Sequence, residues 1–185
     1  MLALDQIANL YGKPMALLIQ CCRVHFNTDT IESLNTSVLA IEEAKVGETL
    51  KRVQLLSRLH RIRPVVYRML LSTTIPEEIK ISLKNELHSI TLQNFEIAKE
   101  TERIVKKLAT VGITAIPYKG VAFSKQFYGD ISMRESTDID LAINPDKLDT
   151  IIELMQDDGY KADGLEGLHR IKRETFIREQ KDFCF

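Results

Sequence analysis

The spacing of apolar residues changes near Gly112, and this change divides the chain into two parts. Before Gly112, apolar residues recur every three or four positions, which is the period of an amphipathic helix. The clearest run begins at Pro76, because proline suits the first position of a helix, and Gly112 is a typical helix end. Its expected apolar face consists of Leu83, Leu87, Ile90, Asn94, Ile97, Thr101, Ile104 and Leu108. We therefore predict a helical region over residues 1–75 and a long connecting helix over 76–112.

After Gly112 the pattern is typical of short strands that alternate with short helices. The predicted strands cover 113–118, 137–143 and 174–185, and the predicted helices cover 120–128 and 147–156. These elements would form a small α/β unit over residues 113–185. The chain as a whole is therefore expected to have an α+β fold.

Composition and charge exclude several classes of protein. The 185 residues are 44% hydrophobic, which is enough for a substantial core, and a net charge of −1 gives no overall attraction to nucleic acid or membranes. The longest apolar run, 15–22, is too short to cross a bilayer, and the N-terminus lacks the pattern of a signal peptide. Three cysteines do not indicate a disulfide framework. We expect a cytoplasmic protein without a membrane partner.

A basic stretch runs from Lys51 to Arg68 and includes Arg61 and Arg63. We interpret it as a solvated helix face. A polynucleotide or an acidic partner is the alternative, although the sequence does not otherwise indicate nucleic acid binding.

Lys119 and Gly120 lie where a predicted strand gives way to a predicted helix. Glycine permits close backbone approach, the amides at a helix start attract phosphate, and lysine can neutralise a phosphate oxygen. The pair is a weak signal by itself, and it is not a P-loop because the required glycine spacing and the following Ser or Thr are missing.

Asp138 and Asp140 are two residues apart within the strand predicted over 137–143, so their side chains are expected on one face. Two carboxylates on a buried strand repel each other and lose solvation, a cost that a cation between them would offset. Their oxygens suit Mg²⁺ or Mn²⁺. The alternative is a strand end at which both aspartates are solvated or cap the next element. An EF-hand is excluded, because Ala142 occupies the third ligand position.

The stretch from Tyr118 to Ile143 carries a resemblance to a known family. It reads Tyr-Lys-Gly-Val-Ala-Phe, then Tyr-Gly-Asp, then Arg-Glu-Ser-Thr-Asp-Ile-Asp-Leu-Ala-Ile. This order resembles the core signature of the uncharacterised bacterial nucleotidyltransferase family of the DNA polymerase beta superfamily. The stretch from His60 to Tyr67 and the long helix before Gly112 are also similar to that family. The resemblance therefore covers nearly the whole chain, and it implies a small polymerase beta-like core with a mixed sheet over 113–185.

The resemblance implies roles for five residues. Asp138 and Asp140 match the superfamily's metal-binding pair, which would hold Mg²⁺ or Mn²⁺ and serve catalysis. Lys119 and Gly120 match the turn that faces the triphosphate of an NTP. Arg134 matches the family's arginine, which would steady a phosphate or the aspartates, or form a structural salt bridge. The implied reaction transfers a nucleoside monophosphate from an NTP to a hydroxyl acceptor.

One departure from the family concerns the third carboxylate, which the family usually supplies in a Glu-Leu-His-Trp-like strand. That strand does not occur here, and Glu179 and Asp182 are the remaining candidates. We therefore expect the core over 113–185 to be incomplete. The alternative function is a catalytically incomplete module of the same fold that binds a nucleotide or a protein. A nucleotide-sugar glycosyltransferase, which could also use an Asp-x-Asp metal motif, is a more distant alternative.

Several properties stay open in the sequence. The base preference, the oligomeric state and the biological pathway are not encoded in any recognisable pattern. The acceptor could be a sugar, a small molecule, a protein side chain or an RNA end.

Overall fold

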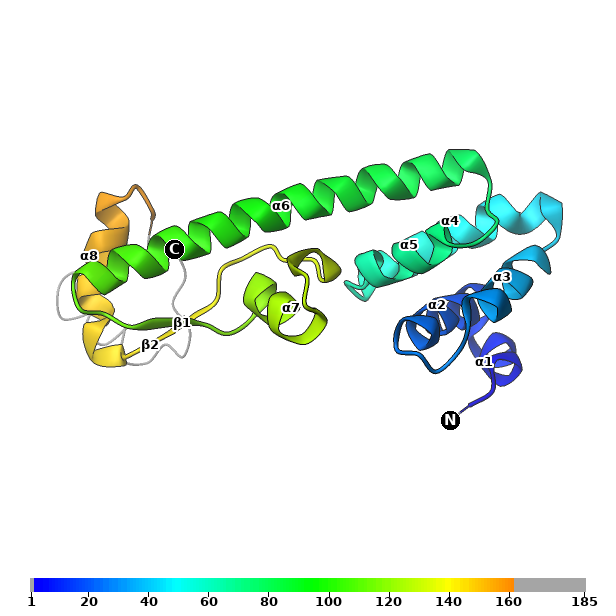
Figure 1. Cartoon of the computed structure of the whole chain (residues 1–185), viewed down its shortest axis with the longest axis horizontal. Coiled ribbons are helices and arrows are strands. Elements are labelled where there is room, and N and C mark those ends of the chain that lie inside the picture. The colour runs from blue at the N-terminus through cyan, green and yellow to red at the C-terminus, as the bar shows by residue number, and fades with distance from the viewer. Residues whose placement is uncertain (1, 162–185) are drawn as a thin grey trace. The chain divides into compact units, whose positions relative to one another are not determined.

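The computed structural model describes residues 2–161, which are mostly helical with one small sheet. In chain order the elements are α1 (Leu4–Tyr11), α2 (Lys13–His25), α3 (Ile31–Leu39), α4 (Glu43–Leu59), α5 (Arg63–Leu71), α6 (Glu77–Thr110), β1 (Ala115–Pro117), α7 (Gly120–Tyr128), the 3₁₀ helix η1 (Ile131–Met133), β2 (Leu141–Ile143), the 3₁₀ helix η2 (Pro145–Lys147) and α8 (Leu148–Asp157) (Figure 1). The predicted α+β class is confirmed. Within this part of the chain, no helix has the length and apolar character that crossing a membrane requires.

The chain forms two compact units. The first contains the residues up to Glu102 together with Pro117–Asp140, and the second contains Arg103–Ile116 together with the chain from Leu141 onward. The predicted division into 1–75, 76–112 and 113–185 stays a prediction. All five residues to which the resemblance gives a role lie in the first unit.

The N-terminal helices of the first unit pack around α2, which contacts α1, α3, α4 and α5. Leu17, Cys21, Leu50, Val66 and Leu70 are among the residues of this core and are almost fully buried. Within one helix these core residues recur at spacings of three or four positions, as at Leu50 and Val53 or Val66 and Leu70, so each helix buries an apolar stripe. This packing gives the first unit a core of its own.

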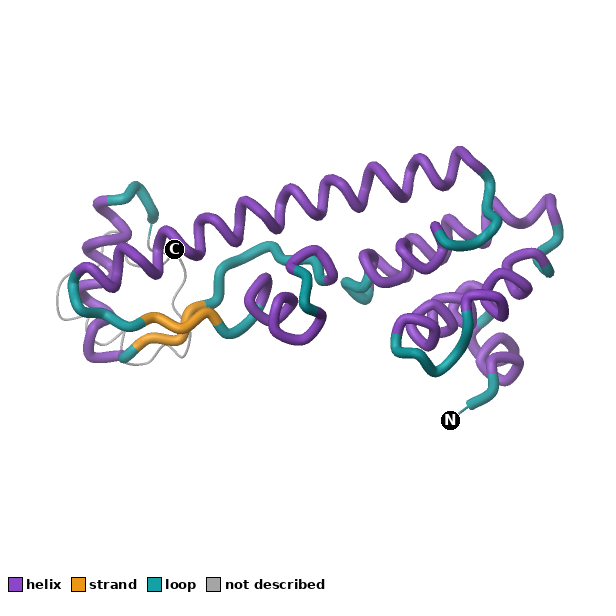
Figure 2. Tube along the Cα trace, in the orientation of Figure 1, coloured by secondary structure: helices purple, strands orange, loops and turns teal. Residues whose placement is uncertain are grey.

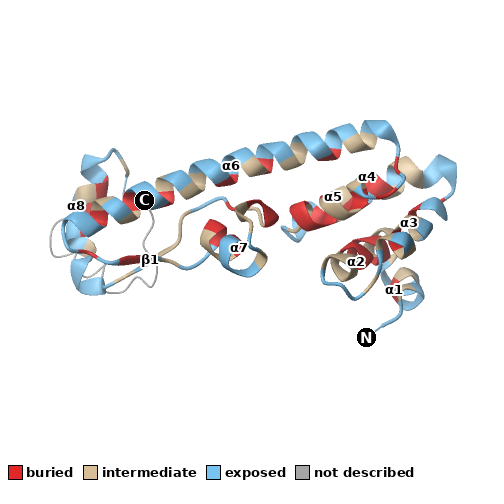
Figure 3. Ribbon diagram, viewed as in Figure 1, coloured by how far each residue is buried: buried red, intermediate tan, exposed pale blue. Residues whose placement is uncertain are grey.

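The predicted long helix is α6, which has 34 residues. It begins directly after Pro76, and Gly112 follows its end with a φ of +73°. The buried positions along α6 agree with the predicted face and include Leu83, Asn94 and Leu108, while Leu87 and Ile97 are half-buried (Figure 3). The polar Asn94 is as deeply buried as the apolar residues of this face.

The two described strands pair as a two-stranded antiparallel sheet (Figure 2). Both strands are shorter than predicted, because only Ala115–Pro117 and Leu141–Ile143 are paired. The predicted mixed sheet is thus not seen in residues 2–161. The strand predicted over 174–185, with the carboxylate candidates Glu179 and Asp182, lies outside the described residues.

In the second unit, the end of α6 is tied to α8. Arg103 donates a hydrogen bond to Asp158 over 2.7 Å, and Lys107 forms an ion pair with the same carboxylate and donates to the Leu154 carbonyl oxygen. The hydrogen bonds from Lys107 and Arg103 lower the pKa of Asp158. Asp158 therefore has a structural role, since its carboxylate joins α8 to the end of α6.

Candidate functional site

The turn between β1 and α7 has a backbone that only glycine adopts easily. Gly120 opens α7 with a φ of +55°, a region that favours glycine because it has no Cβ. A Cβ placed there would lie 3.4 Å from the Asp138 carbonyl oxygen and 3.5 Å from the Ser136 Oγ. Gly120 is therefore required by its conformation, and it allows residues 136–138 to pass beside the start of α7.

Asp138 and Asp140 lie in the extended segment that leads into β2 and not within the strand. The prediction of a buried strand from 137 is wrong here: Asp138 is exposed, and the side chain of Asp140 is 28% exposed. The physical reason is local, because this segment packs against the Gly120 turn. It is joined to the segment after β1 by a hydrogen bond from the Tyr118 amide to the Asp140 carbonyl oxygen at 3.3 Å.

The exposure of the aspartates changes the basis of the metal prediction. Carboxylates that stay hydrated do not need a cation to offset desolvation. Support for a metal site must come instead from the groups that surround Asp138 and Asp140.

Those groups line a pocket of about 300 Å³ that lies wholly in the first unit. The pocket brings together all five residues singled out from the sequence and adds four others. Its lining residues are Arg61, Lys119, Gly120, Arg134, Glu135, Ser136, Thr137, Asp138 and Asp140. Each of these except Gly120 has a polar or charged side chain, so the pocket suits a charged and hydrated ligand better than an apolar one.

Lys119 lies beside the acidic segment. Its Nζ is 3.8 Å from Asp140 Oδ1 and 4.9 Å from the centre of the Tyr118 ring. An ion pair of this length with half-exposed partners contributes little to stability. Its ammonium group is thus held near the aspartates without a strong bond to them.

Arg134 was expected to steady a phosphate or the aspartates, or to form a structural salt bridge. Its guanidinium lies over the Phe123 ring at 5.4 Å, and no residue in the range 2–161 forms an ion pair with it. The structural salt bridge is thus not seen in this range, and its positive charge faces the pocket.

Ser136 lines the pocket and has an unusual hydroxyl group. The residue is only 4% exposed, and its Oγ makes no hydrogen bond to any of the described residues. Buried hydroxyl groups are nearly always paired, since an unpaired one carries a desolvation penalty. This oxygen lies next to the start of α7, where backbone N–H groups also lack helical partners.

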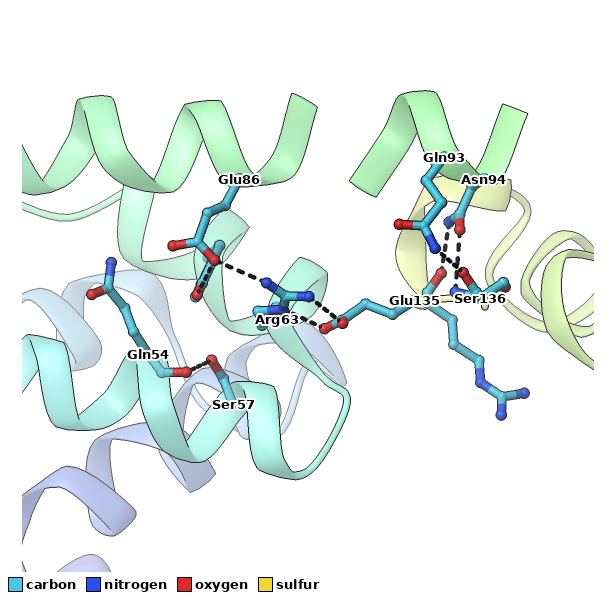
Figure 4. Close-up of polar contacts among 10 residues, drawn as sticks. Gln54, Ser57, Arg63, Glu86, Gln93, Asn94, Glu135 and Ser136 are labelled. Atoms are coloured by element: carbon cyan, nitrogen blue, oxygen red, sulfur yellow. Dashed lines mark hydrogen bonds and ion pairs between the residues drawn. The ribbon is translucent and has the colours of Figure 1, made fainter. Parts of the chain in front are cut away.

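Residues 131–136, which lead into the aspartates, are held by α6. Asn94 Nδ2 donates to the carbonyl oxygens of Ile131 and Arg134, both at 2.7 Å, and its Oδ1 accepts from the Ser136 amide at 3.2 Å. Gln93 Nε2 donates to the Ser136 carbonyl oxygen at 2.9 Å (Figure 4). One buried asparagine therefore fixes three backbone groups of this loop.

A second anchor comes from α5. Arg63 donates two hydrogen bonds to Glu135, at 2.8 and 2.6 Å, and a third to Glu86 at 3.0 Å (Figure 4). Tyr67 donates to the same Glu86 oxygen. The bond to Glu135 is the main reason why the pKa of Arg63 is raised, while burial, and next the charge of Glu86, raise the pKa of Tyr67. Glu135 lines the pocket, but its carboxylate is engaged by Arg63.

We call Arg63, Gln93 and Asn94 the loop clamp, because their side chains together hold residues 131–136. The interpretation of the whole basic stretch as a solvated face is wrong for Arg63, whose side chain is 17% exposed and paired. A polar residue on the apolar face of the long helix, Asn94, was the one visible signal of the loop clamp. Arg61 was noticed only as a member of the basic stretch, and Ser136 was not predicted to belong to the site.

Comparison with known proteins identifies the family. Residues 48–183 match the model of a family described as an uncharacterised nucleotidyltransferase. The chain belongs to this family. No curated protein and no solved structure matches the chain. The match covers both the loop clamp and the pocket, so these are features of a nucleotidyltransferase, whose general role is the transfer of a nucleotidyl group.

No group of three or more His, Cys, Asp or Glu side chains that could hold a metal ion occurs in residues 2–161. The pocket nevertheless supplies two hard carboxylate donors, Asp138 and Asp140. Mg²⁺ is commonly bound by one or two carboxylates and completes its shell with substrate phosphates and water. The donor set therefore fits a metal that arrives with a phosphorylated ligand.

Proposed function

We propose that this nucleotidyltransferase transfers a nucleoside monophosphate from an NTP to a hydroxyl acceptor, with Mg²⁺ or Mn²⁺ held by Asp138 and Asp140. The observation that carries the proposal is the single pocket in which the Lys119–Gly120 turn and both aspartates meet. A phosphate-binding turn beside two carboxylates is the equipment that metal-assisted phosphoryl transfer requires.

The phosphates would lie against the start of α7. The amides at this helix start and the Ser136 hydroxyl offer hydrogen-bond donors, and Lys119 and Arg134 offer positive charge. The unpartnered Ser136 oxygen gains a partner if a phosphate oxygen lies there. Because Gly120 has no Cβ, the ligand and residues 136–138 would be able to approach the start of the helix closely.

Asp138 and Asp140 would hold the metal together with phosphate oxygens. When bound, the metal would screen the charge of the phosphates and stabilise the pyrophosphate leaving group. Because Arg63 engages the Glu135 carboxylate, Asp138 and Asp140 would be the carboxylate ligands that the pocket offers, and we expect the metal to bind much more tightly with the nucleotide than alone.

Calorimetric titration tests this proposal. The chain is titrated with each of the four ribonucleoside triphosphates, with and without Mg²⁺. We expect binding that requires Mg²⁺ and that weakens at least about tenfold in the Asp138→Asn, Asp140→Asn double variant, because each lost carboxylate removes a charged metal ligand. Equal binding by this variant would refute the assignment.

A matched control uses two other aspartates. Asp146 and Asp149 are exposed and do not line the pocket, so the Asp146→Asn, Asp149→Asn variant removes the same charge elsewhere. Its binding should equal that of the wild type.

A second measurement distinguishes transfer from binding alone. Pyrophosphate release with candidate sugar, small-molecule, protein or RNA acceptors, abolished by Asp138→Asn, would establish transfer. Nucleotide binding without release by any acceptor would favour the alternative of a catalytically incomplete binding module.

A further inference from the structure

Arg61 occupies a position that favours glycine. The end of α4 is closed by two hydrogen bonds, from the Arg61 amide to the Arg58 carbonyl oxygen at 3.1 Å and from the Ile62 amide to the Ser57 carbonyl oxygen at 2.9 Å. This is the Schellman arrangement, whose left-handed residue is usually glycine. Here that residue is Arg61, with a φ of +56°.

A left-handed backbone is unfavourable for a residue with a Cβ. Only one other non-glycine residue in the described part of the chain has a positive φ, Asn27, and asparagine tolerates this conformation comparatively well. Arginine has no such local advantage. Backbone strain of this kind is typical of functional sites.

The fold does not use the charge of Arg61. No residue in the range 2–161 forms an ion pair or a side-chain hydrogen bond with its guanidinium. Arg63, two residues later, makes three hydrogen bonds to two glutamates. Of these two neighbouring arginines, Arg63 is paired with residues of the fold, whereas Arg61 lines the pocket without an ion pair to a described residue.

The charges of the pocket show which kind of ligand Arg61 suits. Arg61, Arg134 and Lys119 are positive, Asp138 and Asp140 are negative, and the Glu135 carboxylate is engaged by Arg63. With a divalent cation on the aspartates, the pocket becomes strongly positive. A guanidinium matches the oxygens of a phosphate group with two parallel hydrogen bonds.

We infer that Arg61 binds the phosphates of the nucleotide, so that the connection between α4 and α5 contributes directly to the triphosphate site. This inference rests on the proposed function. It assigns to Arg61 a binding role that outweighs the conformational strain of its position.

The test compares Arg61→Gly with Arg61→Lys in binding and in thermal unfolding. Glycine relieves the backbone strain, so Arg61→Gly should raise the Tm by about 2 to 4 °C. The same variant should weaken binding of Mg²⁺-tripolyphosphate and of the Mg²⁺-nucleotide by the same factor, at least about tenfold. Arg61→Lys keeps a charge without the two parallel bonds, so its affinity should be intermediate.

Two controls separate strain from charge. Asn27→Gly changes a residue with the same φ of +56° outside the pocket, and Arg52→Ala removes an exposed arginine of α4 that does not line the pocket. Neither should change the affinity for tripolyphosphate.

Binding decides the inference. If Arg61→Gly binds both ligands as the wild type does, while the Asp138→Asn, Asp140→Asn variant has lost them, Arg61 has no such role and the proposed function stands. If Arg61→Gly weakens nucleotide but not tripolyphosphate binding, Arg61 does not contact the phosphates. A wild type that binds neither ligand overturns the proposed function and this inference together.

Discussion

The loop clamp and the pocket beside it are both rich in polar side chains, yet they use them in opposite ways. In the loop clamp, Asn94 and Arg63 make three hydrogen bonds each to other parts of the first unit. In the pocket, Arg61 and Arg134 have no ion pair with a described residue, and the Ser136 Oγ has no partner among them. Polar groups with internal partners stabilise the fold, whereas those without internal partners are available to a ligand.

This difference predicts that substitutions in the loop clamp will reduce stability, while substitutions of the pocket aspartates Asp138 and Asp140 will reduce binding and leave stability nearly unchanged.

Substitution of Asn94 should have the largest effect. Asn94→Ala leaves two carbonyl oxygens and one amide without their partner in a buried location, which should lower the free energy of unfolding by about 3 kcal/mol. Urea denaturation measures this change. Asn94→Asp keeps the shape of the side chain but places a carboxylate against two carbonyl oxygens. It should therefore lower the free energy of unfolding at least as much as Asn94→Ala does. A loss below about 1 kcal/mol in both variants would show that the loop does not depend on Asn94.

Substitution of Arg63 should rank second. Arg63→Ala removes the partner of Glu135, whose side chain is 13% exposed. We expect the free energy of unfolding to fall by about 2 kcal/mol, which is less than the loss expected when a fully buried ion pair is broken. A double-mutant cycle with Glu135→Ala isolates the coupling between the two side chains, which we expect to be about 1 to 2 kcal/mol. A coupling near zero would mean that Arg63 does not hold the loop through Glu135.

Substitution of Asp130 should have a smaller effect on stability, and this effect should depend on pH. Its carboxylate caps η1 by accepting from the Ser132 amide at 2.8 Å, and this bond, with further help from Arg68, lowers the pKa of Asp130. Because its pKa in the folded state lies below the value in the unfolded chain, Asp130 stabilises the protein above about pH 4 and loses this effect as the pH falls further.

Asp130→Ala should therefore lower the free energy of unfolding by about 1 kcal/mol at pH 7, and by progressively less below about pH 4. Urea denaturation of both proteins across this pH range measures the difference. A difference that is constant with pH would assign the effect to packing and not to the charged cap.

The aspartates of the pocket should have the smallest effect on stability. Asp138 is exposed and its only described side-chain hydrogen bond is a 3.5 Å contact from Thr137, so Asp138→Asn should change the free energy of unfolding by less than about 0.5 kcal/mol. The same variant should lose Mg²⁺-dependent nucleotide binding. A destabilisation as large as that of Asn94→Ala would remove the distinction between loop clamp and pocket.

Local sequence patterns predicted much of the fold. The buried face of α6 followed from the helical spacing of its apolar residues. The helix α7 begins at Gly120 and ends at Tyr128 as predicted, because the end of a strand, a glycine and an apolar helical turn are all local signals. The residues of the Lys119–Gly120 turn and both aspartates were also found, and they share one pocket.

The sequence could not predict the loop clamp, because its bonds join residues far apart in the chain. Asn94 and Ile131 are separated by 37 positions, and Arg63 and Glu135 by 72. Periodicity describes one element at a time, so it cannot show which loop a buried asparagine will bind. For the same reason the segment with Asp138 was assigned to a strand, although its packing against Gly120 keeps it out of the sheet.

The central claim is that the Lys119–Gly120 turn and the two aspartates form one metal and nucleotide site. Paramagnetic broadening of backbone amide signals by Mn²⁺ together with an NTP tests it most directly, with Mg²⁺ and the same NTP as the diamagnetic reference. We predict that the amides of Gly120, Ser136 and Asp138 broaden first and that this broadening disappears in the Asp138→Asn, Asp140→Asn variant. Sharp signals from these three residues while another part of the chain broadens would contradict the claim.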